Sequence, residues 1–143
     1  MPSGIYRKAT KRGERGLKKF LGELELAIMH VAWTRGSVTV REVHERLSRD
    51  RSLAYTTVMT VMGRLAEKGV LERQRKGKAY LYQPTRSREQ LRGDLAADVA
   101  RALLKDFGQV AVVQFVRELD RVDPGVLARL GDLAEEEQDE DGR

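Results

Sequence analysis

The sequence contains no cysteine and has few aromatic residues and no long apolar run. Without cysteine, the chain can form neither a disulfide nor a thiolate zinc site, and it has no thiol nucleophile. Aromatic residues, at 6% of the chain, are too few for a platform on which single-stranded bases stack. Crossing a bilayer takes roughly 18 to 20 apolar residues, and the basic N-terminus lacks a secretory signal. We therefore expect a cytoplasmic protein without a membrane partner.

Residues that would support catalysis are equally scarce. The two histidines, His30 and His44, lie in expected helices and outside any metal-ligand spacing. The chain also lacks a Gly-x-Ser-x-Gly nucleophile turn and a glycine-rich loop that cradles phosphate. We expect no catalytic site, no metal site and no cofactor, and hence a protein that is not an enzyme. The 143 residues suffice for one small domain or two very small ones.

Charges of opposite sign are separated along the chain. Residues 1–92 contain 21 Lys and Arg against 9 Asp and Glu, whereas the rest contains 6 against 13. A basic half attracts a polyanion such as nucleic acid, which would repel an acidic half. The separation predicts one half that binds nucleic acid and one half that assembles with a second copy of the chain.

The two ends show this separation in its strongest form. Residues 1–20 are rich in Lys and Arg and poor in apolar residues, which predicts a disordered basic arm. Such an arm either lies along DNA or only keeps the chain soluble. Residues 135–143 are mostly Asp and Glu, and we expect them to form a solvated acidic tail without a site.

Residues 21–85 predict three helices followed by a hairpin. The first helix runs from Gly22 to about Gly36. It carries an apolar stripe at helical spacing, made of Leu24, Ala27, Ile28, Val31 and Ala32. Thr39 and Glu42 form a capping box, in which the hydroxyl accepts from the Glu42 amide and the carboxylate returns to the Thr39 amide. This box starts the second helix at Val40.

The third helix is expected from about Tyr55 to Lys68, although Ala54 is a poor N-cap. A helical wheel gathers Val58, Val61, Met62 and Leu65 on one face. The opposite face holds Thr56, Thr57, Thr60, Arg64 and Glu67.

After the third helix the sequence period changes from 3.6 to 2. Two short strands, 70–75 and 79–83, flank a basic turn at Gly77, and Pro84 closes the second strand. Three helices followed by a basic hairpin are typical of the winged helix-turn-helix. The fold class is therefore mainly α with a small β-hairpin: a winged helix followed by a C-terminal helical region.

In a winged helix the third helix enters the major groove, where hydroxyl side chains contact bases and basic side chains hold phosphates. The candidate DNA-binding residues are Thr39, Arg41, Arg49, Arg51, Tyr55, Thr56, Thr57, Thr60, Arg64, Arg75, Lys76 and Lys78. Any one of them is equally well explained as an ordinary solvated side chain. The set as a whole, together with the charge and the helix order, favours double-stranded DNA.

Residues 86–134 predict three more helices, which we interpret as a dimerisation domain. Ser87 and Gln90 form a capping box for the first, Gly108 ends it, and Asp123-Pro124 starts the third. These helices carry more apolar surface than they can bury alone, so a second copy is expected to cover them. The candidate interface residues are Leu91, Leu95, Val99, Leu103, Phe107, Val113, Phe115, Val116, Leu127 and Leu130.

Several motifs follow one another along the basic half. They are Leu21-Gly22-Glu23-Leu24-Glu25, Ala54-Tyr55-Thr56-Thr57-Val58-Met59-Thr60, Arg64-Leu65, Lys68-Gly69 and Ala79-Tyr80-Leu81-Tyr82-Gln83-Pro84. Together they resemble the penicillinase repressor family of BlaI, MecI and CopY type, and most closely its β-lactamase-repressor branch. The resemblance implies a homodimer that represses transcription from a dyad-symmetric operator. In the family's β-lactam systems a membrane-bound sensor-protease triggers cleavage of the repressor, so a regulatory protease is an implied partner.

Two departures from the family limit what the resemblance implies. Copper-responsive members carry a C-terminal cysteine cluster, which this chain lacks. The Asn-Phe dipeptide cleaved in staphylococcal-type members is also missing, because residues 96–100 read Ala-Ala-Asp-Val-Ala. We still expect derepression by proteolysis of the β-lactam or cell-wall-stress type. The alternatives to a specific repressor are a winged-helix protein-interaction module and a non-specific DNA-binding protein.

Overall fold

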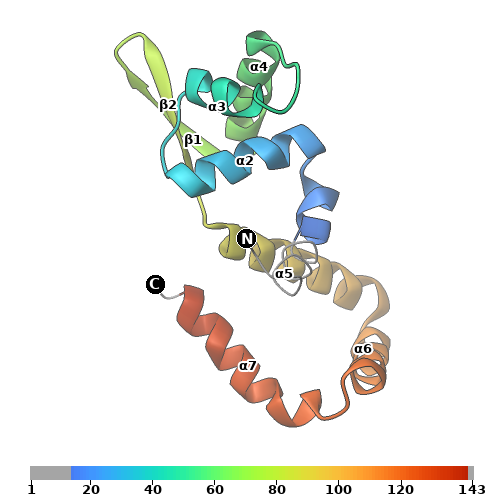
Figure 1. Ribbon diagram of the computed structural model, residues 1–143. Coiled ribbons are helices and arrows are strands. Elements are labelled where there is room, and N and C mark those ends of the chain that lie inside the picture. Colours follow the sequence, from blue (N-terminus) through green and yellow to red (C-terminus); the bar gives the residue numbers. More distant parts are fainter. Residues whose placement is uncertain (1–13, 142–143) are drawn as a thin grey trace. The chain divides into compact units, whose positions relative to one another are not determined.

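The computed structural model describes residues 14–141, and the chain divides into two compact units within one long helix (Figure 1). The first unit ends at Leu95 and the second begins at Ala96. In chain order the elements are α2 (Glu23–Arg35), α3 (Val40–Leu47), α4 (Tyr55–Glu67), β1 (Leu71–Lys76), β2 (Ala79–Pro84), α5 (Arg88–Phe107), α6 (Gln109–Val122) and α7 (Val126–Asp141). The predicted fold class, mainly helical with one small hairpin, is confirmed.

The first unit is a winged helix-turn-helix. α2 packs against α3, α4 and β2, while α4 also packs against β1. Apolar side chains from all of these elements form one core. Its most deeply buried members are Ile28, Met29, Ala32, Val38, Val43, Val58, Met62, Leu65, Leu71 and Tyr82.

α2 buries a different set of side chains from its expected stripe. Leu26 and Met29 are buried beside Ile28, whereas Leu24 and Val31 are only partly covered. The stripe was inferred from one apolar spacing, which assumes that a helix is covered from one side. α2 has several neighbours, so the buried arc is wider and shifted.

The start of the chain differs from the expected disordered arm. Residues 14–20 are helical, Leu17 is fully buried, and Glu14 Oε1 lies 3.3 Å from His30 Nε2 on α2. Disorder up to residue 20 was therefore a wrong prediction, because Leu17 and Leu21, four residues apart, add one helical face to the core. The rest of the expected arm, residues 1–13, lies outside the described residues.

The predicted cap of α3 is largely confirmed, and so is the expectation that Ala54 caps α4 poorly. At the start of α3, the Glu42 amide donates to the Thr39 hydroxyl at 3.2 Å. The Glu42 carboxylate accepts from that same hydroxyl at 3.1 Å, rather than from the Thr39 amide as expected. α4 begins at Tyr55, and Ala54 gives it no side-chain cap.

The hairpin has the expected turn, and the bounds of its strands differ from those expected by no more than one residue. Lys76 pairs with Ala79, so Gly77 and Lys78 form a two-residue turn. Gly77 has a φ of 67°, which glycine adopts without strain. A further bridge was not expected: the Val38 amide donates to the Tyr82 carbonyl on β2 at 2.9 Å, and the Val38 carbonyl accepts from the Tyr82 amide at 2.8 Å.

The first turns of α5 belong to the winged-helix unit. The predicted capping box is present, with the Ser87 amide donating to Gln90 Oε1 at 2.9 Å. Leu91 is only 7% exposed within the winged-helix core, and Leu95 packs against that core. The unit therefore extends beyond the expected boundary at residue 85. This corrects the assignment of Leu91 to a dimer interface, because its side chain is buried within its own unit, whereas Leu95 is only partly buried.

The third helix of the C-terminal half has different ends from those expected. α7 begins at Val126, because Pro124 and Gly125 form a turn instead of the first helical residues. It continues to Asp141, so the expected acidic tail is helical over its described part. Glu and Gln are good helix formers, which explains why the helix extends past Leu133.

Candidate nucleic-acid interface

α4 presents the expected threonine face to solvent. Thr56, Thr57 and Thr60 are all exposed, and Arg64 lies exposed one turn after Thr60. The opposite face is buried through Val58, Val61, Met62 and Leu65. Threonine hydroxyls can bond to base edges, and threonine methyl groups can touch the thymine methyl. This face therefore has the chemistry for reading bases, and Arg64 has the chemistry for holding a phosphate.

The candidate DNA-binding residues around α3 differ in how accessible their side chains are to DNA. Arg49 and Arg51 are exposed in the loop between α3 and α4. Arg41 is exposed at the start of α3, where its Nε lies 3.1 Å from Glu45 Oε1. The Thr39 hydroxyl, in contrast, is occupied by both hydrogen bonds to Glu42. Thr39 thus acts first as the cap of α3, while the two loop arginines flank the start of α4.

His44 connects α3 to the start of α4. Its Nε2 lies 2.7 Å from the carbonyl oxygen of Leu53, in the loop before α4. Its ring also meets the ring of Tyr55 edge to face, with 5.6 Å between the centroids. Because Ala54 supplies no cap, these two contacts hold the first turn of the threonine-bearing helix. The sequence analysis gave His44 no such role.

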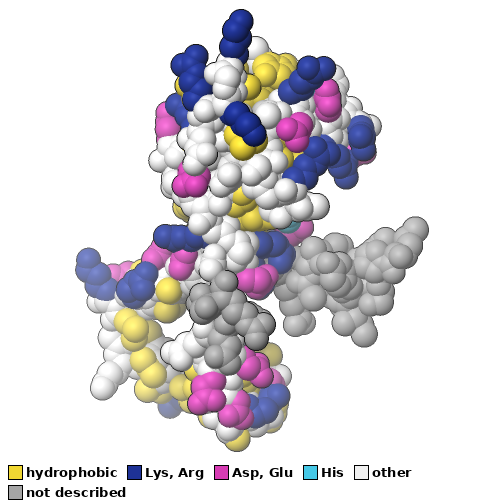
Figure 2. Space-filling view, turned by 90° about the vertical axis from the view of Figure 1, so that its left-hand side faces the viewer, with side chains coloured by type: hydrophobic (Ala, Val, Ile, Leu, Met, Phe, Trp, Pro, Cys, Tyr) yellow, Lys and Arg dark blue, Asp and Glu magenta, His cyan; other side chains and the backbone are white. Residues whose placement is uncertain are grey.

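The tip of the hairpin carries the expected cations. Arg75, Lys76 and Lys78 are all exposed, and Arg75 Nε donates to the carbonyl of Gly77 at 3.3 Å. In Figure 2, Lys and Arg side chains gather over the upper part of the winged-helix unit, with fewer carboxylates between them. Such a cationic tip suits the sugar-phosphate backbone of DNA.

Lower on the hairpin, Arg73 and Tyr80 form a pair that the candidate set lacks. The guanidinium of Arg73 lies over the Tyr80 ring, 4.7 Å from its centroid. The nearby Tyr82 side chain raises the pKa of Arg73, so this residue stays cationic. The two-residue turn places Arg73 diagonally across from Tyr80, so the hairpin register was the signal that could have identified this pair.

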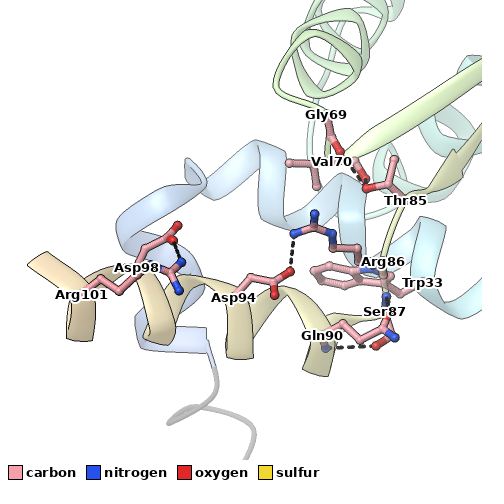
Figure 3. A network of polar contacts seen from close by, with 10 residues as sticks. All are labelled: Trp33, Gly69, Val70, Thr85, Arg86, Ser87, Gln90, Asp94, Asp98 and Arg101. Carbon is pink, nitrogen blue, oxygen red and sulfur yellow. Dashed lines mark hydrogen bonds and ion pairs between the residues drawn. The ribbon is translucent and has the colours of Figure 1, made fainter. Parts of the chain in front are cut away.

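A polar network anchors the exit from the hairpin (Figure 3). Trp33 Nε1, on α2, donates to the carbonyl of Arg86 at 3.0 Å. The Thr85 hydroxyl lies 2.7 Å from the carbonyl oxygen of Gly69. Arg86 also pairs with Asp94 on α5. These contacts hold the base of the hairpin against the helices, while its tip projects from them.

The described residues offer no metal centre. Within 14–141, no three His, Asp or Glu side chains gather where they could hold a metal ion. A shallow hollow of about 400 Å³ lies between α4 and β1. Its lining includes Glu67 and Glu72 beside Arg73, a mixture of charges that does not suit a polyanion. Over the same described residues, no helix has both the length and the apolar character needed to span a membrane.

Comparison with known proteins gives the family. Residues 21–136 match the family described as "Penicillinase repressor". The chain belongs to the penicillinase repressor family. The "Transcriptional regulator BlaI" of Mycobacterium tuberculosis is 44% identical over 112 residues, covering 76% of this chain and 80% of that protein. The "Penicillinase repressor" of Bacillus licheniformis is 31% identical over 64 residues, covering 45% of this chain and 50% of that protein.

Two solved structures are similar to this chain at TM-scores below 0.5. The solution structure of the DNA-binding domain of the repressor BlaI is 30% identical with a TM-score of 0.44, covering 47% of this chain and 82% of that one. A MarR family protein from Bacillus stearothermophilus is 19% identical with a TM-score of 0.47, covering 86% and 88%.

Membership of the penicillinase repressor family confirms the resemblance drawn from the motifs. The family relatives are named as a transcriptional regulator and a repressor, which are not enzymes. The family match begins at residue 21, so the helical segment 14–20 lies before the matched region.

Proposed function

We propose that this member of the penicillinase repressor family binds a dyad-symmetric DNA operator as a homodimer and thereby represses transcription. The observation that carries the proposal is the exposed threonine face of α4, with arginines in the loop before it and a cationic hairpin in the same unit. The threonines supply contacts to bases, and the cations fix the position of the protein on the phosphates.

The second unit supports the homodimer. On α5, Val99, Leu103 and Phe107 repeat every four residues and are exposed in the single chain. The other predicted interface residues of this unit are also exposed or only partly covered: Val113, Phe115, Val116, Leu127 and Leu130. Among its described residues only Val126 is buried. Figure 2 shows uncovered hydrophobic side chains along this unit, and exposed apolar patches mark interaction sites.

A second copy also explains how a short recognition surface could select one operator. Two α4 helices related by a twofold axis would enter successive major grooves about 10 base pairs apart. Each half-site would contribute a modest affinity, and the dimer would combine the two.

The proposal includes release by proteolysis. Cleavage within the C-terminal unit by a regulatory protease would separate the DNA-binding units and weaken operator binding, and family membership supports this part of the proposal. Residues 96–100 lack the Asn-Phe dipeptide, so the protease would cleave a different sequence within the C-terminal unit.

Selection from random DNA tests the proposed function. Full-length protein is incubated with a library of random duplexes, and the bound duplexes are amplified and sequenced. Fluorescence anisotropy then compares the enriched duplex with a scrambled one at several salt concentrations. We expect a dyad-symmetric sequence that binds more tightly than the scrambled duplex, with an affinity that falls as salt rises because counterions are released. Equal binding to both duplexes, or binding to neither, would overturn the proposal in favour of a non-specific DNA-binding protein or a protein-interaction module.

A further inference from the structure

The exposed face of α4 holds two residues besides the threonines. Met59 is 46% exposed in the middle of the helix, and Gly63 follows one turn later. At about 100° per residue, Met59 lies about 60° and Gly63 about 20° to one side of Thr56, while Thr60 lies about 40° to the other. The four positions therefore share one face.

Nothing among the described residues requires glycine at position 63. A Cβ added to Gly63 would meet no atom within 4 Å, and Gly63 is not one of the glycines with a positive φ. Glycine within a helix lowers its stability relative to alanine. The glycine thus weakens α4 without serving its packing or its backbone. Gly63 borders the shallow hollow between α4 and β1, and without a side chain it leaves the helix backbone open to another molecule there.

Met59 gives the same face an adaptable apolar side chain. The face carries no carboxylate until Glu67, near the end of α4. In the major groove, the C5 methyl of thymine is the apolar group that a base pair presents. The flexible methionine side chain can adapt its shape to such a group. A surface that combines methionine and threonine over the first turns of α4, next to cationic segments, matches DNA better than an acidic or a purely polar partner.

We propose that Met59 and Gly63 complete the base-reading surface of α4. Met59 packs against a thymine methyl group, and Gly63 lets the middle of the helix lie close to the DNA, so that Thr56 and Thr60 reach base edges. This inference rests on the proposed function, because it requires α4 to enter the major groove of an operator.

The first test substitutes Gly63→Ala in the full-length protein, with Gly93→Ala on α5 as the matched control. Both glycines are helical and open to an added Cβ, so both variants are expected to raise the melting temperature. We expect Gly63→Ala to weaken binding to the enriched duplex about tenfold, the loss typical of one disturbed base contact. Gly93→Ala should bind as the wild type does.

Two results of this test have different meanings. A Gly63→Ala protein that melts higher and still binds the enriched duplex as tightly as the wild type would overturn the role of Gly63. A wild-type protein that shows no preference for any duplex would instead overturn the proposed function, and this inference with it.

The second test removes the thymine methyl. Each thymine of a half-site is replaced by deoxyuridine, and binding is measured for the wild type and for Met59→Ala. The wild type should lose affinity about fivefold at one position, while Met59→Ala, already weaker on the thymine duplex, should lose nothing more there. The same loss in both proteins at every position, or no loss in the wild type, would overturn the contact between Met59 and thymine.

Discussion

Thr60 and Lys76 are both exposed, but they are expected to act on DNA in different ways. Thr60, on α4, faces base edges, so Thr60→Ala should reduce the discrimination between the enriched and scrambled duplexes by about 1 kcal/mol or more. Lys76, at the hairpin tip, meets phosphate, so Lys76→Ala should weaken binding to both duplexes equally and lower the salt slope by about one. Anisotropy titrations with both duplexes measure the two effects. Equal losses on both duplexes for Thr60→Ala would contradict its assignment to base reading.

At the same scale, the sequence identified residues whose chemical type suggests their role. Thr60 was placed by a helical wheel, and the same wheel puts Met59 on its face. Met59 was missed because it was assigned to neither face of the helix, and its angle was not compared with that of Thr60. Arg73 was missed because its partner, Tyr80, lies across a hairpin and not along the chain. Leu17 was hidden among basic neighbours, and only the folded core shows what it packs against.

At the scale of elements, the start of α4 depends on α3. His44 Nε2 donates a hydrogen bond to the Leu53 carbonyl, and the His44 ring packs on Tyr55. His44→Ala should lower the free energy of unfolding by about 1–2 kcal/mol, the sum of a neutral hydrogen bond and an aromatic contact. Alanine favours helix more than histidine does, so the measured loss is a lower bound on what the two His44 contacts contribute to the free energy of unfolding.

Urea denaturation measures this loss, and a variant of the same helix provides its control. Arg46 lies exposed on α3, 3.7 Å from Asp50 in an exposed ion pair, so Arg46→Ala should change stability by less than about 1 kcal/mol. A loss for His44→Ala no greater than that of the control would show that α4 starts without help from α3.

Local signals predicted elements well, and long-range contacts explain the errors. Thr39 and Gly77 specify a cap and a turn within a few residues, and both were predicted from sequence alone. The bridge from Val38 to Tyr82 joins residues far apart in the chain, which no periodicity reveals. The extension of the winged-helix unit into α5 depends likewise on Leu91 fitting a core built by other elements.

At the scale of the whole molecule, the boundary between the two units, after Leu95, lies close to residue 92, where the sign of the charge changes along the chain. The unit ending at Leu95 holds 21 of the 27 Lys and Arg residues and a core of its own. The unit beginning at Ala96 holds apolar side chains that stay exposed in the single chain. The sequence could show that these helices carry more apolar surface than they bury alone. It could not show which residues form the interface, because these depend on how two copies pack together.

The last prediction concerns the second copy of the chain that would bury this apolar surface. Phe115 on α6 is 63% exposed in the single chain, so a charge there would cost little if no partner covered it. In a homodimer, Phe115→Glu buries an unpaired carboxylate, which is costly enough to separate the copies. Sedimentation should then show monomers, while circular dichroism still shows helical protein. Gln114→Glu adds the same charge to α6 about 100° away and should remain dimeric.

DNA binding should follow the change in assembly. A monomer holds one half-site, so Phe115→Glu should lose most of its preference for the enriched duplex over a scrambled one. Its winged-helix unit keeps its cations, so weak salt-dependent binding to both duplexes should remain. A Phe115→Glu protein that stays dimeric would place the interface away from this part of α6. A monomer that binds the enriched duplex as tightly as the wild type would show that one α4 helix is enough to select the operator.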